Sequence, residues 1–365
     1  MGQSFRLIAP HRRERLCWCG KLGEILFDGS ASTLVSLFAR PVIPLKSAVN
    51  EPETPPVAVR KTVVPRKRRW QTEDSCESSH SHEPTRDKVA RPRLPEMPVE
   101  ISRIIFDSLD ITSVFLLGVT CQRLWVIAKS VIERHFAAYL GAWAGTPIVC
   151  VGTGTCRGRN VTYPQGLLLP EDVDELQEGL DLDELEDCLP DEYAGRPVNL
   201  YDIADARYDV IKDHGVYFPQ DLLGVALDFT HKYPRPADIL QLANPEPSYF
   251  YPTNQEWVLR NLTTQEFVRP TAIALHKSHI HGPFIDKLGY GEVILSRICW
   301  STDDFTSMAG EGIHQGMWAR HALDIVPSTH LDIGGPWKDI SDEVAEDIAE
   351  IWKSEYGEDW RKQHW

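Results

Sequence analysis

Residues 97–136, MPVEISRIIFDSLDITSVFLLGVTCQRLWVIAKSVIERHF, contain three apolar segments separated by short polar breaks. The first segment opens with Pro98 just inside a helix start and Glu100 in the first turn. Proline pre-sets φ there, and the carboxylate suits the positive end of the helix dipole. Apolar side chains then recur at three- and four-residue spacing, which predicts one apolar helix face. They are Ile101, Ile104, Ile105 and Leu109.

Two further apolar runs, 114–119 and 124–132, complete a prediction of three short helices. A domain of about 40 residues barely stabilises itself, because too little of its surface is buried. Its apolar surface also exceeds what three helices can hide among themselves. The sequence therefore predicts that this segment binds a partner.

The segment resembles the F-box family. The family's Leu-Pro-x-Glu-Ile opening corresponds to residues 97–101, and its next apolar pair to Ile105 and Phe106. Its helix-ending leucine corresponds to Leu109, and its Val-Cys-Lys-Arg-Trp segment to residues 120–124. Met97 for leucine and Leu124 for tryptophan are departures from the pattern, with Trp125 one place late.

The resemblance implies a substrate-recognition receptor of an SCF-type cullin–RING ubiquitin ligase. Such a receptor binds the Skp adaptor, and through it the cullin scaffold, with its F-box, and an unknown protein substrate with the rest of the chain. It performs no reaction itself. The residues expected to supply the Skp contact, or the small core behind it, are Met97, Pro98, Ile101, Ile105, Leu109, Leu116, Leu117 and Leu124.

The 365 residues are enough for two domains and linkers, and the predicted class is α+β. We expect a three-helix F-box at 94–136 attached to a mixed α+β body with an antiparallel sheet at 137–365. Residues 1–45 are expected to pack on that body. Residues 46–93, rich in proline, serine and charge, predict a disordered basic linker, and 171–192 a solvated acidic insertion.

A weak internal echo links the two ends of the chain. Residues Phe5, Leu7, Glu14 and Leu16 match Trp257, Leu259, Glu266 and Val268 at identical spacing. Gly23-Glu24-Ile25-Leu26 then echoes Gly291-Glu292-Val293-Ile294. Both copies predict strand, turn, strand and then an apolar run, which places residues 1–45 beside the segment near 257–300.

Four further elements are predicted in the body. Residues 147–151 predict a buried strand, and 256–269 a hairpin with its turn near 262–264. Residues 293–300 predict another strand. Residues 341–356 predict an amphipathic helix with Val344, Ile348, Ile351 and Trp352 on one face, ended by Gly357.

The net charge of −15 hides an asymmetry, since residues 1–93 carry +7 and residues 94–365 carry −22. Within the linker, Arg66, Lys67, Arg68 and Arg69 are a candidate nuclear-import signal or anion-binding patch. One alternative function is therefore a nuclear regulator that binds nucleic acid or an acidic partner through this linker. The acidic body argues against broad contact with phosphates.

A second alternative is a metal-dependent enzyme in residues 140–340. His276, His279 and His281 are the best metal-like cluster, but no nearby glutamate and no regular helix or strand spacing accompanies them. We therefore expect a polar loop, no metal and no cofactor. Hydrolase, zinc-protease and kinase motifs are missing from the sequence.

We expect no membrane association, because no apolar run approaches 18 residues and the N-terminus is charged where a signal peptide is apolar. The eight cysteines form no C-x-x-C pair, which indicates reduced thiols. The expected location is the cytoplasm, the nucleus or both.

Overall fold

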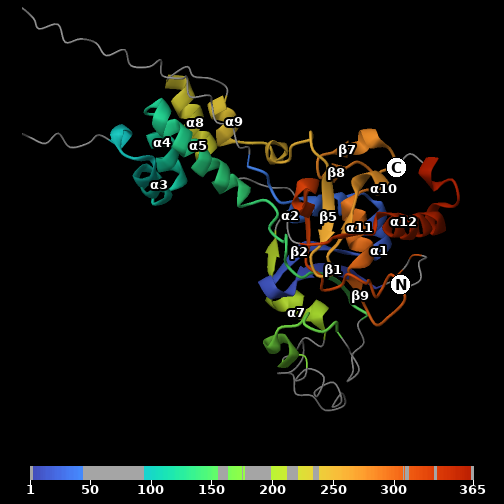
Figure 1. Ribbon diagram of the computed structural model, residues 1–365. Coiled ribbons are helices and arrows are strands. Elements are labelled where there is room, and N and C mark those ends of the chain that lie inside the picture. Colours follow the sequence, from blue (N-terminus) through green and yellow to red (C-terminus); the bar gives the residue numbers. More distant parts are fainter. Residues whose placement is uncertain are drawn as a thin grey trace, which may run out of the picture. The chain divides into compact units, whose positions relative to one another are not determined.

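The chain divides into two compact units (Figure 1). One unit comprises residues 1–43 and 129–365, here called the body, and the other comprises residues 44–128. The structure, a computed structural model, describes residues 3–43, 94–154, 163–174, 176, 199–211, 221–232, 238–306, 308, 312–332 and 335–362. The predicted linker 46–93, with Arg66, Lys67, Arg68 and Arg69, and most of the predicted acidic insertion lie outside these residues.

The first sheet of the body has the strand order β4-β2-β1-β3-β9. Its strands are β1 Phe5–Ala9, β2 Glu14–Gly20, β3 Val149–Gly152, β4 Asp209–Ile211 and β9 Cys299–Trp300. The β1 strand has no exposed residue and pairs antiparallel with both β2 and β3. The N-terminal segment is therefore central to a sheet whose other strands come from much later in the chain.

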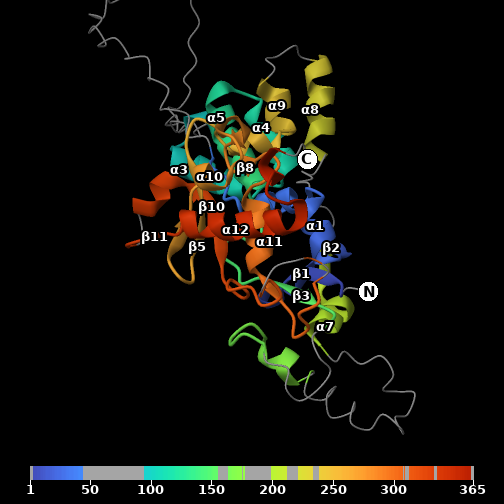
Figure 2. The ribbon, with the colours of Figure 1, turned by 90° about the vertical axis from the view of Figure 1, so that its right-hand side faces the viewer.

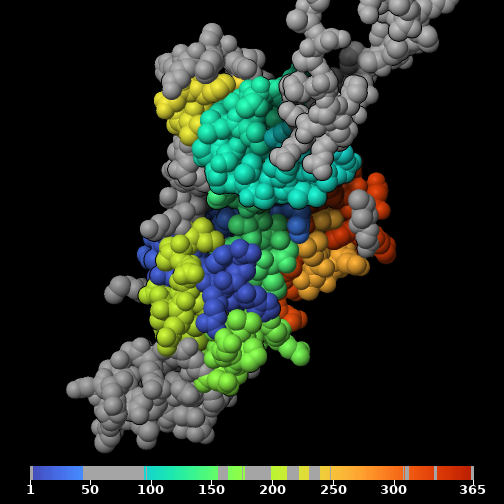
Figure 3. Space-filling view, turned by 90° about the vertical axis from the view of Figure 1, so that its left-hand side faces the viewer, coloured from blue at the N-terminus to red at the C-terminus, as the bar shows by residue number. Residues whose placement is uncertain are grey.

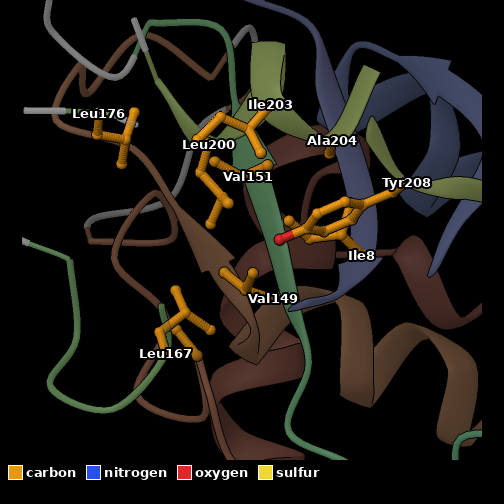
Figure 4. Close-up of a cluster of buried hydrophobic side chains, with 10 residues drawn as sticks. Ile8, Val149, Val151, Leu167, Leu176, Leu200, Ile203, Ala204 and Tyr208 are labelled. Carbon is orange, nitrogen blue, oxygen red and sulfur yellow. The ribbon is translucent and has the colours of Figure 1, made fainter. Parts of the chain in front are cut away.

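Helix α7, Leu200–Arg207, covers one face of this sheet. Asn199 begins the helix by accepting a hydrogen bond from the Asp202 amide at 2.9 Å. Figure 4 shows Leu200, Ile203 and Ala204 of the helix directed toward Ile8, Val149 and Val151 of the strands. These side chains are fully buried and form a hydrophobic cluster between the helix and the sheet.

The second sheet has the order β10-β5-β6-β11. Its strands are β5 Trp257–Asn261, β6 Glu266–Val268, β10 Leu323–Pro327 and β11 Lys338–Asp339. The predicted hairpin at 256–269 is confirmed, because β5 and β6 pair antiparallel across residues 262–265. The N-terminal segment also reaches this sheet, where the Arg40 amide donates to the Ile325 carbonyl at 2.9 Å.

The two sheets repeat one arrangement. In each, a hairpin (β1–β2 or β5–β6) is extended by an antiparallel strand on its first member (β3 or β10) and a parallel strand on its second (β4 or β11). Ala9 faces Glu14 in the first hairpin and Asn261 faces Glu266 in the second, at echo-related positions. The residue before each second strand, Arg13 or Gln265, has positive φ, 53° or 58°. The sequence echo thus corresponds to a structural duplication.

The strand predicted at 293–300 is wrong for most of its length. Residues Tyr290–Arg297 form helix α11, and only Cys299–Trp300 are a strand. The reason is a helix start just before the apolar run, at Tyr290. The Glu292 carboxylate accepts a hydrogen bond from the Gly289 amide at 2.9 Å, and this capping contact outweighs the strand propensity of Val293 and Ile294. Glu24 makes the corresponding contact with the Lys21 amide in α1, at 3.3 Å.

Other helices of the body include α1 Leu22–Phe27, α2 Val35–Phe38, α8 Asp221–Lys232, α9 Asp238–Ala243, α10 Pro270–Ile273 and α12 Ser341–Tyr356. The predicted C-terminal helix is confirmed with its bounds, since Val344, Ile348 and Trp352 are buried and Gly357 follows the last turn. Helix α12 lies beside α11, as Figure 2 shows.

The α+β class is confirmed. The predicted antiparallel sheet is correct for the central strand pairs, whereas the pairs at three sheet edges, β2–β4, β3–β9 and β6–β11, are parallel. The second unit contains α3 Val99–Asp107, α4 Ile111–Gly118 and the first part of α5 Gln122–Ala137.

We expect Gly291→Ala to destabilise the body. A Cβ at Gly291 would overlap the backbone carbonyl of Ala31, so α11 and the 31–32 segment would have to separate. Overpacking against backbone costs about 2 kcal/mol or more in the free energy of unfolding, measured by chemical denaturation. Alanine normally stabilises a helix relative to glycine, so a loss identifies the close approach.

The matched control is Gly224→Ala in α8, where a Cβ would meet no atom within 4 Å. This exposed position should gain roughly 0.5–1 kcal/mol from helix propensity alone. A gain of similar size at Gly291 would contradict the packing described.

We expect the free energy of unfolding to depend on pH because of Glu292. Burial raises the pKa of this carboxyl to about 7 from its ordinary 4.5, with the Asp28 charge adding to the effect, and its second oxygen has no hydrogen-bond partner. The folded protein therefore holds a proton that the unfolded chain has lost between these two pH values. Stability is unpenalised below pH 4.5, falls as the pH rises to 7, and stays lower above it, by roughly 3 kcal/mol.

Glu292→Gln keeps an acceptor for the Gly289 amide and removes the titration. Relative to wild type, its unfolding free energy should be equal near pH 4.5 and higher by roughly 3 kcal/mol near pH 8, as followed by denaturant titration. A difference that does not change with pH would overturn this assignment.

Candidate functional site: the helices of residues 94–128

Local hydrogen bonds define the starts of α3 and α4. Pro98 precedes α3, and its carbonyl accepts the first helical bond, from the Ser102 amide at 3.1 Å. Asp110 caps α4 by accepting from the Ser113 amide at 3.0 Å and the Ser113 hydroxyl at 2.5 Å. These bonds lower the pKa of Asp110, with the hydroxyl contributing most. The break at Asp110 in the sequence is therefore a helix cap.

A small core holds the three helices together. Phe106, Val114 and Phe115 are fully buried, and the Phe115 and Trp125 rings meet edge to face at 5.9 Å. Helices α4 and α5 approach closely at Gly118, where an added Cβ would overlap the Ala128 methyl group. The glycine thus allows the two helices to pack at short distance.

Arg123 ties the start of α5 to the entrance of α3. Its guanidinium donates to the Pro95 carbonyl at 2.7 Å and to the Met97 carbonyl at 2.8 Å. These two acceptors lie in and just after the short 3₁₀ turn Leu94–Glu96. The planar, forked guanidinium suits two neighbouring acceptors, which lysine does not reproduce. Arg123 therefore fixes the backbone that carries Pro98.

The predicted contact residues differ in exposure. Ile101 and Leu116 are 45% and 47% exposed, and Pro98 is exposed as well. Met97, Ile105, Leu109 and Leu117 are half-buried. Leu124 is buried and belongs to the core behind the surface.

The predicted contact residues leave out Ile104, the most exposed large apolar side chain of α3. The buried residues of α3 are Ser102 and Phe106, so Ile104 faces away from the core and is 65% exposed. The three- and four-residue spacing included Ile104, but it could not tell an apolar face that is buried from one that is not. Figure 3 shows a broad solvent-facing side of these helices, in teal. We call Ile101, Ile104 and Leu116 the exposed apolar set.

The three histidines of the sequence cluster lie at a turn and in a short strand. The His276 Nδ1 accepts from the Ser278 amide at 3.1 Å, and the His281 Nε2 lies 3.2 Å from an Asp286 oxygen. They belong to a short 3₁₀ turn, Lys277–His279, and a small hairpin, β7 Ile280–His281 with β8 Phe284–Ile285. Within the described ranges, no three histidine, cysteine or acidic side chains converge as metal ligands would.

The helices that the structure describes include none that is both long and apolar enough to span a bilayer. No family model, curated protein or solved structure matches this chain. The site must therefore be interpreted from its own geometry.

Arg123→Ala should loosen the entrance of α3 without unfolding the unit. The variant loses two hydrogen bonds from a charged donor, worth about 1 kcal/mol together at an exposed position. The hydrogen-bonded amides at this entrance, Met97 and Ser102, should exchange hydrogen about fivefold faster, measured by exchange mass spectrometry. The control is Gln122→Ala, an exposed neighbour on the same helix, and equal acceleration in both variants would contradict the role given to Arg123.

Proposed function

We propose that the chain is a substrate-recognition adaptor of an SCF-type cullin–RING ubiquitin ligase. Helices α3 and α4 bind the Skp adaptor, α5 supports them through the buried Leu124 and through Arg123, and the body binds a protein target. The adaptor carries out no reaction of its own. It raises the effective concentration of the target near a ubiquitin carrier, and so acts by proximity.

The observation that carries the proposal is the outward orientation of the exposed apolar set. In α3 the core is built by Phe106 and Ser102, which leaves Ile101 and Ile104 in solvent. Leu116 is exposed on the next helix while its neighbours Val114 and Phe115 are buried. Three large apolar side chains left in solvent on two successive short helices support a protein interface here.

The F-box resemblance gives this surface its partner. The Pro98 opening coincides with the start of α3, and the Cys-x-Arg segment contributes Arg123, whose two hydrogen bonds hold that opening in place. The proposal places the protein in the cytoplasm, the nucleus or both, where such ligases act.

Co-purification with a Skp adaptor tests this function. The double variant Ile101→Asp/Leu116→Asp places two charges on half-exposed positions, so the fold should persist while the interface is lost. Capture of the adaptor should fall at least about tenfold, since each buried unpaired charge costs more than 1.4 kcal/mol.

The matched control is Val126→Asp on α5. Val126 is 67% exposed and lies on the opposite side of its helix from the buried Leu124. This variant should capture the adaptor as wild type does. If wild type captures none, or the double variant captures as much as wild type, the proposed function fails.

A further inference from the structure

The body contains an open cleft between the end of α11, the segment 312–317 and the outer side of α12. Its volume is about 510 Å³, within the range of binding sites rather than packing defects. Gly316 brings the 312–317 segment close to α11, because a Cβ there would overlap the Arg297 carbonyl. The Gly316 amide also donates to the Cys299 carbonyl at 2.8 Å. The cleft is thus formed by ordered backbone on two sides and a helix on the third.

The buried positive charge in the cleft lining, Arg297, is neutralised by a carboxylate of the same lining. The Arg297 side chain is 5% exposed and forms an ion pair with Asp347 of α12. Its guanidinium also lies 5.1 Å from the centre of the Trp318 ring. Burial lowers the pKa of Arg297, while Asp347 and Glu343 oppose this effect. Arg297 also donates to the Met317 sulfur at 2.6 Å, so it joins α12 to the 312–317 segment and stabilises the cleft.

The rim of the cleft is negative. Glu350 is an exposed lining residue without a basic partner among the ion pairs of the described residues. Phosphates and other anions would meet a repulsive potential here, whereas a basic side chain would be attracted.

The cleft also offers apolar surface. Met317 is 58% exposed on one wall, and Ile351 is half-buried on the helix opposite. Methionine adapts its shape to different apolar partners and is frequent on peptide-binding surfaces. The space between Met317 and Ile351 therefore suits one apolar side chain of moderate size.

We propose that this cleft binds a short segment of a partner protein in which a lysine or arginine lies beside a leucine or methionine. The apolar side chain contacts Met317 and Ile351, and the basic side chain pairs with Glu350. The binding step stands on the geometry of the cleft. Only the consequence, that the bound protein is the one ubiquitinated, rests on the proposed function.

An array of short synthetic peptides tests the inference on the purified full-length chain without any Skp adaptor. Each peptide places one lysine or arginine within two positions of a leucine or methionine, and a matched array replaces the basic residue with glutamate. Peptides of the first array should bind and those of the second should not. Binding of the strongest peptides, measured by fluorescence anisotropy, should weaken as salt rises above about 0.15 M.

Two cleft variants and two controls make the test specific. Glu350→Lys and Met317→Ser should each raise the dissociation constant of the strongest peptide at least about tenfold and fivefold, respectively. The controls are Glu346→Lys, on the same helix but outside the cleft lining, and Phe305→Ser, an apolar side chain 55% exposed outside it. Both controls should bind within about twofold of wild type.

The inference is overturned if neither array binds, if the glutamate peptides bind as well as the basic ones, or if Glu346→Lys weakens binding as much as Glu350→Lys. Because no adaptor is present, these outcomes are independent of Skp capture. If the wild-type chain binds the peptides but captures no Skp adaptor, the proposed function is wrong and the peptide site still stands.

Discussion

The pairing of strand β1 on both of its edges is the contact on which the body depends. Phe5–Ala9 is fully buried between β2 and β3, so the first sheet cannot close without the N-terminal residues. Residues 31–32 meet α11 at Gly291, and Arg40 pairs with the buried Asp324 of β10 at 2.6 Å. Residues 44–128 thus interrupt, in sequence, a unit that is complete only when both sides of the interruption come together.

The duplication explains why the two sheets share strand order and register. Each copy has a left-handed residue directly before its second strand, Arg13 or Gln265. A later helix start in each copy is capped by a glutamate, Glu24 or Glu292. The copies differ in burial of the capping group. Glu24 is partly exposed, whereas Glu292 is sealed and acquires a raised pKa. In the second copy this capping carboxylate has become a pH-sensitive part of the core.

Two proposed surfaces follow different physical rules. The exposed apolar set of α3 and α4 is short of apolar neighbours, so water exclusion would drive its contact with a partner. The cleft beside α12 combines one apolar site with a negative rim, so it selects by charge as well as by shape. The proposed adaptor would need both kinds of surface, one for a permanent contact with a ligase and one for a selective contact with a target.

Turn residues, caps and periodicity act within a few positions of the chain. Local sequence was therefore enough to predict the α+β class, the hairpin at 256–269, the C-terminal helix and the helix start at Pro98. It misassigned residues 293–297, whose apolar run suits either a strand or a buried helix until the Glu292 cap is seen. Only the tertiary structure decided which apolar face of α3 is covered. Ile104 and Phe106 are both apolar residues, and the sequence alone does not distinguish them. Their burial depends on which side of the helix the neighbouring helices occupy. The cleft was also beyond sequence reasoning, since Arg297, Met317 and Glu350 are brought together by the packing of distant segments.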